Sequence, residues 1–122
     1  MWLKHQVWYW FPVYLYASVI FYLSSISVLP EPEQQFGITI SDAAKHVVEY
    51  FILSFLLFRA FINSRSSAVK AKAYLLAITL SILYGATDEL HQLFVPERVC
   101  SGLDVVLDGV GSSLILIREF FN

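Results

Sequence analysis

The chain has 122 residues, of which 57% are hydrophobic and only 15% are charged. Soluble domains carry about a quarter of their residues as charged side chains, so this composition excludes an ordinary water-soluble globule and favours a membrane protein. The formal net charge of −2 gives no indication that the chain binds nucleic acid.

The first predicted element covers residues 7–29, a stretch of 23 residues without a charge. A helix needs about 20 apolar residues to cross the hydrocarbon core of a bilayer. The apolar part of a signal peptide is shorter, typically about 7–15 residues. We therefore expect an uncleaved transmembrane helix here.

Three further apolar segments follow, and each carries ionisable residues at one end. Residues 43–62 begin with Lys45, His46 and Glu49, whereas residues 73–95 are apolar at first and become polar at Asp88. The last segment, residues 101–117, has two acids in its first half. The pattern predicts an all-α fold, a single domain over residues 1–122 and a bundle of four transmembrane helices.

The basic residues predict how this bundle is oriented. Six of them fall on one side of the predicted membrane, namely Lys4, Arg59, Arg65, Lys70, Lys72 and Arg118. Only Lys45 and Arg98 fall on the other side. Because short cytoplasmic loops are enriched in Lys and Arg, we expect both termini in the cytoplasm, and the acidic helix ends at the outer surface.

Helical spacing places the polar residues of each segment on one face. These faces carry, in chain order, Lys45, His46, Glu49 and Tyr50; then Ser81, Gly85, Asp88, Glu89 and Gln92; then Ser101, Asp104, Asp108, Gly111 and Ser112. Small residues let helices approach closely in lipid. Charged groups in a bilayer face protein or water rather than lipid, so we expect the three faces to converge.

Each of these residues also has a structural interpretation. Asp104 lies three residues after Ser101, as in a helix-capping box, and Lys45 with Glu49 has the spacing of an intrahelical ion pair. His46 and Glu49 are one turn apart, but the metal-site spacings known from sequence are not matched in full. We predict neither a metal nor a cofactor, and we favour a functional site because so many ionisable groups share one depth.

Residues 84–98, with the sequence YGATDELHQLFVPER, resemble the signature of the VanZ-like membrane proteins. The resemblance continues through Ser101, Asp104 and Gly111, and includes residues 41–53 upstream. The chain departs from the family pattern at Ala43, where Lys is usual, and at Asp108, where Asn is usual. The resemblance implies a multi-pass protein of the bacterial cytoplasmic membrane and a context of resistance to the glycopeptide teicoplanin. It implies no reaction.

Three hypotheses follow for the convergent polar faces. In the first, they bind an anionic envelope lipid or a lipophilic glycopeptide through Lys45, His46, Tyr50, Asp88, Glu89, Gln92, Arg98, Ser101, Asp104 and Asp108, with Arg98 and Lys45 contacting anionic oxygen. In the second, the site is an enzyme in which His46, Glu49, Asp88, Glu89 and Asp104 perform acid–base catalysis. In the third, the same groups form only a structural lock between helices. A lock should be closed, whereas a site should open to the surface or to lipid.

Overall fold

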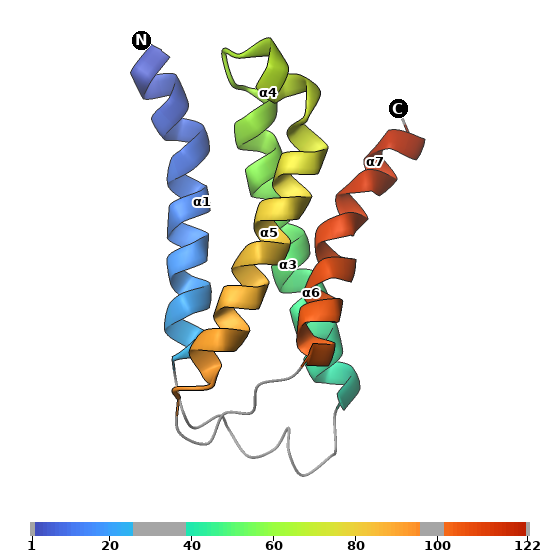
Figure 1. Cartoon of the computed structure of the whole chain (residues 1–122). Helices are drawn as coiled ribbons and strands as arrows, with labels where there is room; N and C mark the ends of the chain where they lie inside the picture. Colours follow the sequence, from blue (N-terminus) through green and yellow to red (C-terminus); the bar gives the residue numbers. More distant parts are fainter. Residues whose placement is uncertain (1, 26–38, 96–101, 122) are drawn as a thin grey trace.

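The computed structural model describes residues 2–25, 39–95 and 102–121, without the side chains of residues 39–43 and Phe120. Apart from short turns, this part of the chain is helical, which confirms the predicted all-α class. Its helices are, in order, α1 (Trp2–Ser24), α3 (Thr39–Ile62), α4 (Ser67–Ala71), α5 (Ala73–Gln92), α6 (Gly102–Ser113), the 3-10 turn η1 (Leu114–Leu116) and α7 (Ile117–Phe120). The long helices run alongside one another (Figure 1).

Both ends of the described chain lie at the same end of this bundle as α4 (Figure 1). The opposite end holds the end of α1, the start of α3, the end of α5 and the start of α6. We call this opposite end the polar end, because it carries the ionisable residues of α3, α5 and α6.

The helix bounds differ from those expected from apolar runs. The first helix begins at Trp2 and ends at Ser24, earlier at both ends than the predicted range 7–29, of which residues 26–29 lie outside the described part. A helix can extend through Lys4 and His5 at an interface, so an apolar run does not mark where it begins. α3 begins at Thr39 rather than at residue 43, and α5 ends at Gln92 rather than at residue 95.

The fourth predicted helix, residues 101–117, is not continuous in the structure. α6 ends at Ser113 and is followed by the tighter turn η1 and by the short helix α7. The sequence analysis predicted no helix at α4, which lies in a Ser- and Lys-rich segment between two apolar segments. Ser66 caps α4 by accepting a hydrogen bond from the backbone N–H of Val69 at 3.3 Å.

α3 is the central helix, since it contacts α1, α5 and α6. Its inward residues Tyr50, Leu53 and Leu57 are buried and pack with Ala77 of α5 and Ile115 of η1. α1 lies at the side of the bundle and buries only Val13, Ile20 and Ser24.

α1 is long and apolar enough to cross a membrane, and no other helix in the described part of the chain meets the same criterion. Only 17% of its apolar window is buried, so α1 is not the core helix of a soluble domain. α3 falls short because each of its 18-residue stretches contains Lys45, Glu49 and either Asp42 or Arg59. α6 has only 12 residues. The four-span arrangement with cytoplasmic termini therefore stays a prediction.

Candidate functional site

His46 on α3 and Asp108 on α6 are in direct hydrogen-bonding contact at the polar end. The Nδ1 atom of His46 lies 2.8 Å from Oδ1 of Asp108, and Asp108 is only 1% exposed. An ionised carboxylate only accepts hydrogen bonds. Nδ1 is therefore the donor, and this bond fixes the orientation of the imidazole ring.

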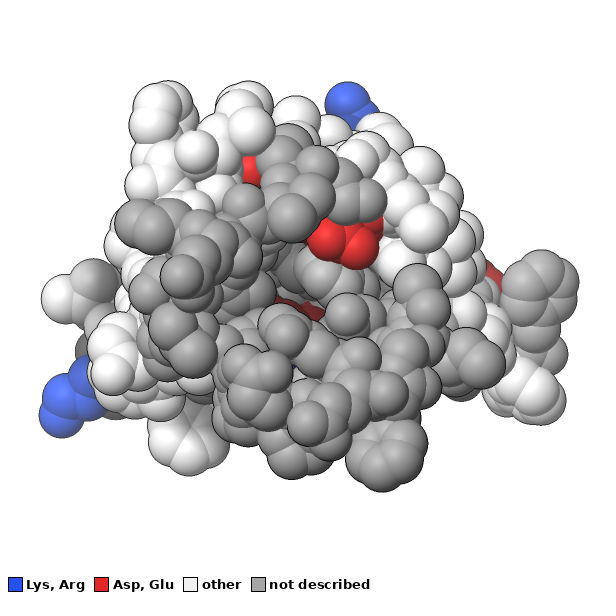
Figure 2. All heavy atoms as spheres, turned by 90° about the horizontal axis from the view of Figure 1, so that it is seen from below, with Lys and Arg blue, Asp and Glu red and all other residues white. Residues whose placement is uncertain are grey.

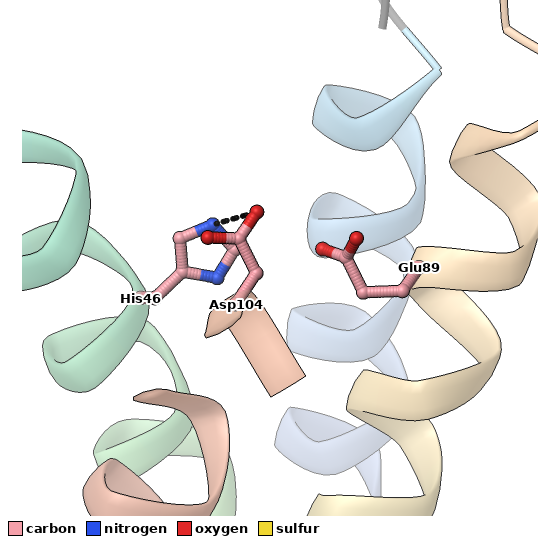
Figure 3. Close-up of side chains that lie close together, drawn as sticks. All are labelled: His46, Glu89 and Asp104. Atoms are coloured by element: carbon pink, nitrogen blue, oxygen red, sulfur yellow. Dashed lines mark ion pairs between the residues drawn. The ribbon is translucent and has the colours of Figure 1, made fainter. Parts of the chain in front are cut away.

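The other ring nitrogen of His46 faces two more carboxylates. Nε2 lies 3.6 Å from Oδ2 of Asp104, one turn before Asp108 on α6. Glu89 points toward the same place from α5 (Figure 3). One atom from each of His46, Glu89 and Asp104 lies within 4.8 Å of the other two. Three helices thus bring one imidazole and two carboxylates together.

Asp88 precedes Glu89 on α5, is also buried, and lies within electrostatic range of Asp108. We call His46, Asp88, Glu89, Asp104 and Asp108 the polar cluster. The sequence predicted that these five residues converge, and the structure brings them together from α3, α5 and α6.

A seam of buried serines lies about one helical turn deeper in the bundle than the polar cluster. The hydroxyl of Ser112 donates to the carbonyl of Asp108 at 2.8 Å and lies 2.6 Å from the hydroxyl of Ser81 on α5. The hydroxyl of Ser54 on α3 donates to the carbonyl of Ser112 at 2.9 Å. These bonds join the three helices under the cluster and hold its carboxylates at a fixed depth.

Two glycines set the close approach of these helices. A Cβ atom at Gly111 would lie 2.2 Å from the carbonyl oxygen of Val47, so α6 meets the backbone of α3 at this point. A Cβ atom at Gly85 of α5 would lie 2.7 Å from Oδ2 of Asp108. The glycines therefore place α5 and α6 close enough for their acids to face His46.

The polar cluster is not sealed. The side chains of His46 and Asp104 are 17% and 25% exposed. Seen from the polar end, Asp and Glu atoms reach the surface near the middle of the molecule (Figure 2). This arrangement is more open than a fully buried structural lock would be.

The remaining predicted site residues lie around the cluster. Tyr50 is fully buried, one turn after His46 on α3 and farther from the polar end. Gln92 points toward α1, where its amide donates to the hydroxyl of Ser24 at 3.3 Å. Lys45 and Glu49 line a groove of about 450 Å³ between α1 and α3. Arg98 and Ser101, both predicted to bind ligand, lie outside the described residues.

The structure groups the possible metal ligands differently from the sequence. Helical spacing pairs His46 with Glu49, but the three-residue group contains Glu89 and Asp104 instead. His91 does not belong to this group and faces α1: its Nε2 lies 2.9 Å from the hydroxyl of Ser25, and its ring stacks on Phe21.

Two features were missed by sequence reasoning. Ser54 was counted as part of an apolar segment, although it continues the helical stripe that runs from His46 through Tyr50. The direct bond between His46 and Asp108 was not singled out either, because the acid–base set expected around His46 contained Glu49 and Asp104 but not Asp108. Following this helical face along all of α3 would have found Ser54. The pairing of His46 with Asp108 could not be found this way, because it depends on the offset between α3 and α6.

Comparisons with known proteins were made for the whole chain. A search of curated proteins and a search of solved structures each gave no match. A family model described as VanZ/LLP1 matches residues 7–117. This match covers α3, α5 and α6 in full and most of α1, and it includes the five residues of the polar cluster. The chain therefore belongs to the VanZ/LLP1 family.

Proposed function

We propose that this chain is a multi-pass protein of the bacterial cytoplasmic membrane that binds an anionic envelope lipid at its polar end. The acyl chain lies in the groove between α1 and α3, and the head group lies at the surface beside Lys45 and the polar cluster. The observation that carries the proposal is an apolar groove that ends next to an open polar cluster.

The groove has the composition expected for a lipid chain. α1 contributes Tyr16, Val19, Ile20 and Leu23, and α3 contributes Ala44, Lys45, Val48 and Glu49. Its volume of about 450 Å³ lies in the range of small-molecule sites. Most of the lining is apolar, and the two charged residues come from the first half of α3, at the polar end.

Lys45 supports an anionic head group. It is exposed, and it is the basic residue that the groove contains in the described part of the chain. A Lys or Arg near an anionic lipid surface contributes about 1 kcal/mol to binding. Lys45 and His46 are consecutive on a helix and so project about 100° apart. One helix end therefore serves both the groove and the polar cluster.

A second candidate function rests on the bond between His46 and Asp108. An imidazole oriented by a buried carboxylate, with its other nitrogen accessible, is the usual arrangement of a general base. In this alternative, His46 accepts a proton from water or a lipid hydroxyl while Asp108 holds the ring. The substrate is then an envelope lipid, and Asp104 and Glu89 are the further carboxylates that take part in acid–base catalysis.

The test is an inventory of lipids that copurify with the full chain in mild detergent, measured by mass spectrometry. We would compare the wild type with Lys45→Ala and with Val48→Trp, which fills the groove at a position that is 54% exposed. Lys70→Ala is the matched control, because Lys70 is an exposed lysine on α4 at the other end of the bundle.

The wild type and Lys70→Ala should retain the same anionic lipid, whereas Lys45→Ala should retain several-fold less and Val48→Trp almost none. Equal retention by all four proteins would contradict the groove. Displacement of the retained lipid by teicoplanin would identify the glycopeptide as a competing ligand. If the wild type converts the lipid chemically and His46→Gln does not, the result would favour the second candidate function, an enzyme that uses His46 as a general base.

A further inference from the structure

We propose that His46, Glu89 and Asp104 bind a divalent transition-metal ion of the zinc or manganese class. The inference goes beyond lipid binding and needs no lipid. It starts from three ligand atoms of different helices, which lie within 4.8 Å of one another at the polar end (Figure 3).

The distances suit a small ion. Two ligands that each lie about 2.1 Å from a tetrahedral ion are about 3.4 Å apart. Nε2 of His46 and Oδ2 of Asp104 are separated by 3.6 Å, close to this value. The outer limit of 4.8 Å for the set requires an adjustment of at most about 1.4 Å, which rotation of the Glu89 or Asp104 side chain supplies.

Asp108 provides the independent observation, because it completes the environment of a metal-binding histidine. Ligand histidines almost always donate their second ring N–H to a carboxylate or carbonyl, which fixes the tautomer. Nδ1 of His46 lies 2.8 Å from Oδ1 of Asp108, so Nε2 presents its lone pair toward Asp104 and Glu89. A cation bound between this lone pair and the two carboxylates would offset their negative charge.

The buried oxygens of Asp108 point to the same conclusion. Its Oδ2 is fully buried and has no hydrogen-bond partner among the described residues, and Gly85 leaves the space that this oxygen occupies. Burying a carboxylate without compensation is costly. A divalent ion on the other side of the His46 ring supplies positive charge to both Asp104 and Asp108.

The donor set favours a transition metal over calcium or magnesium. Calcium and magnesium prefer oxygen ligands only, whereas imidazole nitrogen suits zinc and its neighbours. Three protein ligands leave a fourth position open at the exposed side of the cluster, as in sites that bind water or a substrate. An anionic oxygen is the ligand that such a position takes.

The experiment uses the full chain in detergent, purified through a tag without histidine and treated with a chelator. Calorimetric titrations with zinc, manganese and calcium chloride would measure binding of each metal alone. The variants are His46→Gln, Asp104→Asn and Asp108→Asn, and Glu119→Gln on α7 is the matched control because it is exposed at the opposite end.

We expect one zinc or manganese ion per chain and much weaker calcium binding. His46→Gln and Asp104→Asn should each weaken binding more than the roughly 10- to 100-fold typical of outer partners. Asp108→Asn, which keeps an acceptor for Nδ1, should fall near the lower end of that range, and Glu119→Gln should match the wild type. Stoichiometric binding that survives His46→Gln would overturn the site, as would the absence of binding by the wild type.

A measurement on the wild type alone guards against variants that fail to fold. Pulsed electron paramagnetic resonance of the manganese-loaded protein should detect coupling to an imidazole nitrogen. A bound ion without this coupling would exclude His46 as a ligand. Because these measurements report the bound metal and not the lipid, metal binding can succeed or fail separately from the proposed lipid function.

Discussion

Gly111→Ala tests whether the packing of α6 against α3 sets the geometry of the polar cluster. The added Cβ would lie 2.2 Å from the carbonyl oxygen of Val47, and 2.9 Å from both its carbonyl carbon and its Cα. Real Cβ contacts are essentially never shorter than 3.0 Å, so the two backbones must separate by about 0.8 Å, the difference between 3.0 and 2.2. Neither backbone can rotate away as a side chain would.

The magnitude follows from two opposing effects. Overpacking of this kind costs about 1–3 kcal/mol, and the backbone obstacle places Gly111→Ala at the upper end. Alanine also favours the helix over glycine by about 1 kcal/mol. The net loss of stability is therefore about 2 kcal/mol, or roughly 8 °C in melting temperature at about 4 °C per kcal/mol.

Gly109→Ala is the matched control on the same helix. Its added Cβ would meet only the Ile82 side chain, with Cδ1 at 3.8 Å and Cγ1 at 3.9 Å, which are ordinary contacts, so the helix preference for alanine remains. We expect this variant to melt about 4 °C higher than the wild type. Thermal melting in detergent, followed by circular dichroism, measures both. The packing argument is refuted if Gly111→Ala melts as high as Gly109→Ala.

Three more predictions follow from the same structure. First, Ala68→Cys on α4, made in a Cys100→Ser background, should resist an impermeant thiol reagent in intact cells and react after lysis. Reaction in intact cells would reverse the predicted topology. Asp108→Leu should destabilise the protein by about 3–5 kcal/mol in denaturant titrations because it leaves His46 without its buried partner, whereas Asp108→Asn should cost far less; equal losses would mean that the bond does not matter. Tyr84→Phe removes the hydroxyl that donates to a backbone carbonyl of α1 and should lower the melting temperature by an amount equivalent to about 1 kcal/mol; an unchanged melting temperature would argue against this docking of α1.

The sequence predicted the positions of the main helices because their signals are local. Apolar runs placed α1, α3 and α5, and helical spacing placed the acids of α5 and α6 on inward faces. The interruption after Ser113 has no comparable signal. The residues of η1, Leu114–Leu116, are all apolar and read as ordinary helix.

The membership of the polar cluster was predictable, but its pairing was not. Spacing showed that His46, Asp104 and Asp108 each face inward. Which acid meets Nδ1 depends on the offset between α3 and α6, which Gly111 and the serine seam determine together. His46, Glu89 and Asp104 were expected among the converging residues, but which ligand atoms lie closest depends on the same offset, since the three residues come from three helices.

The same limit applies to Gln92. Its spacing from Asp88 placed it on the polar stripe of α5, yet the structure directs its amide to Ser24 of α1. A helix as long as α5 contacts different neighbours along its length. A stripe that runs from Ser81 to Gln92 can therefore leave one interface and enter another, and a single sequence does not show where that happens.

The central claim is that an anionic lipid occupies the groove between α1 and α3, and photocrosslinking tests it most directly. A photoactivatable anionic lipid would be incorporated into membranes that contain the full chain, and the crosslinked residues would be mapped by peptide mass spectrometry. The account predicts crosslinks concentrated at Val19, Leu23 and Val48, lost when Lys45 is replaced by Ala. Crosslinks spread evenly over the exposed apolar face of α1, including Trp8 and Tyr14, would contradict it, because bulk lipid contacts that face without a specific site.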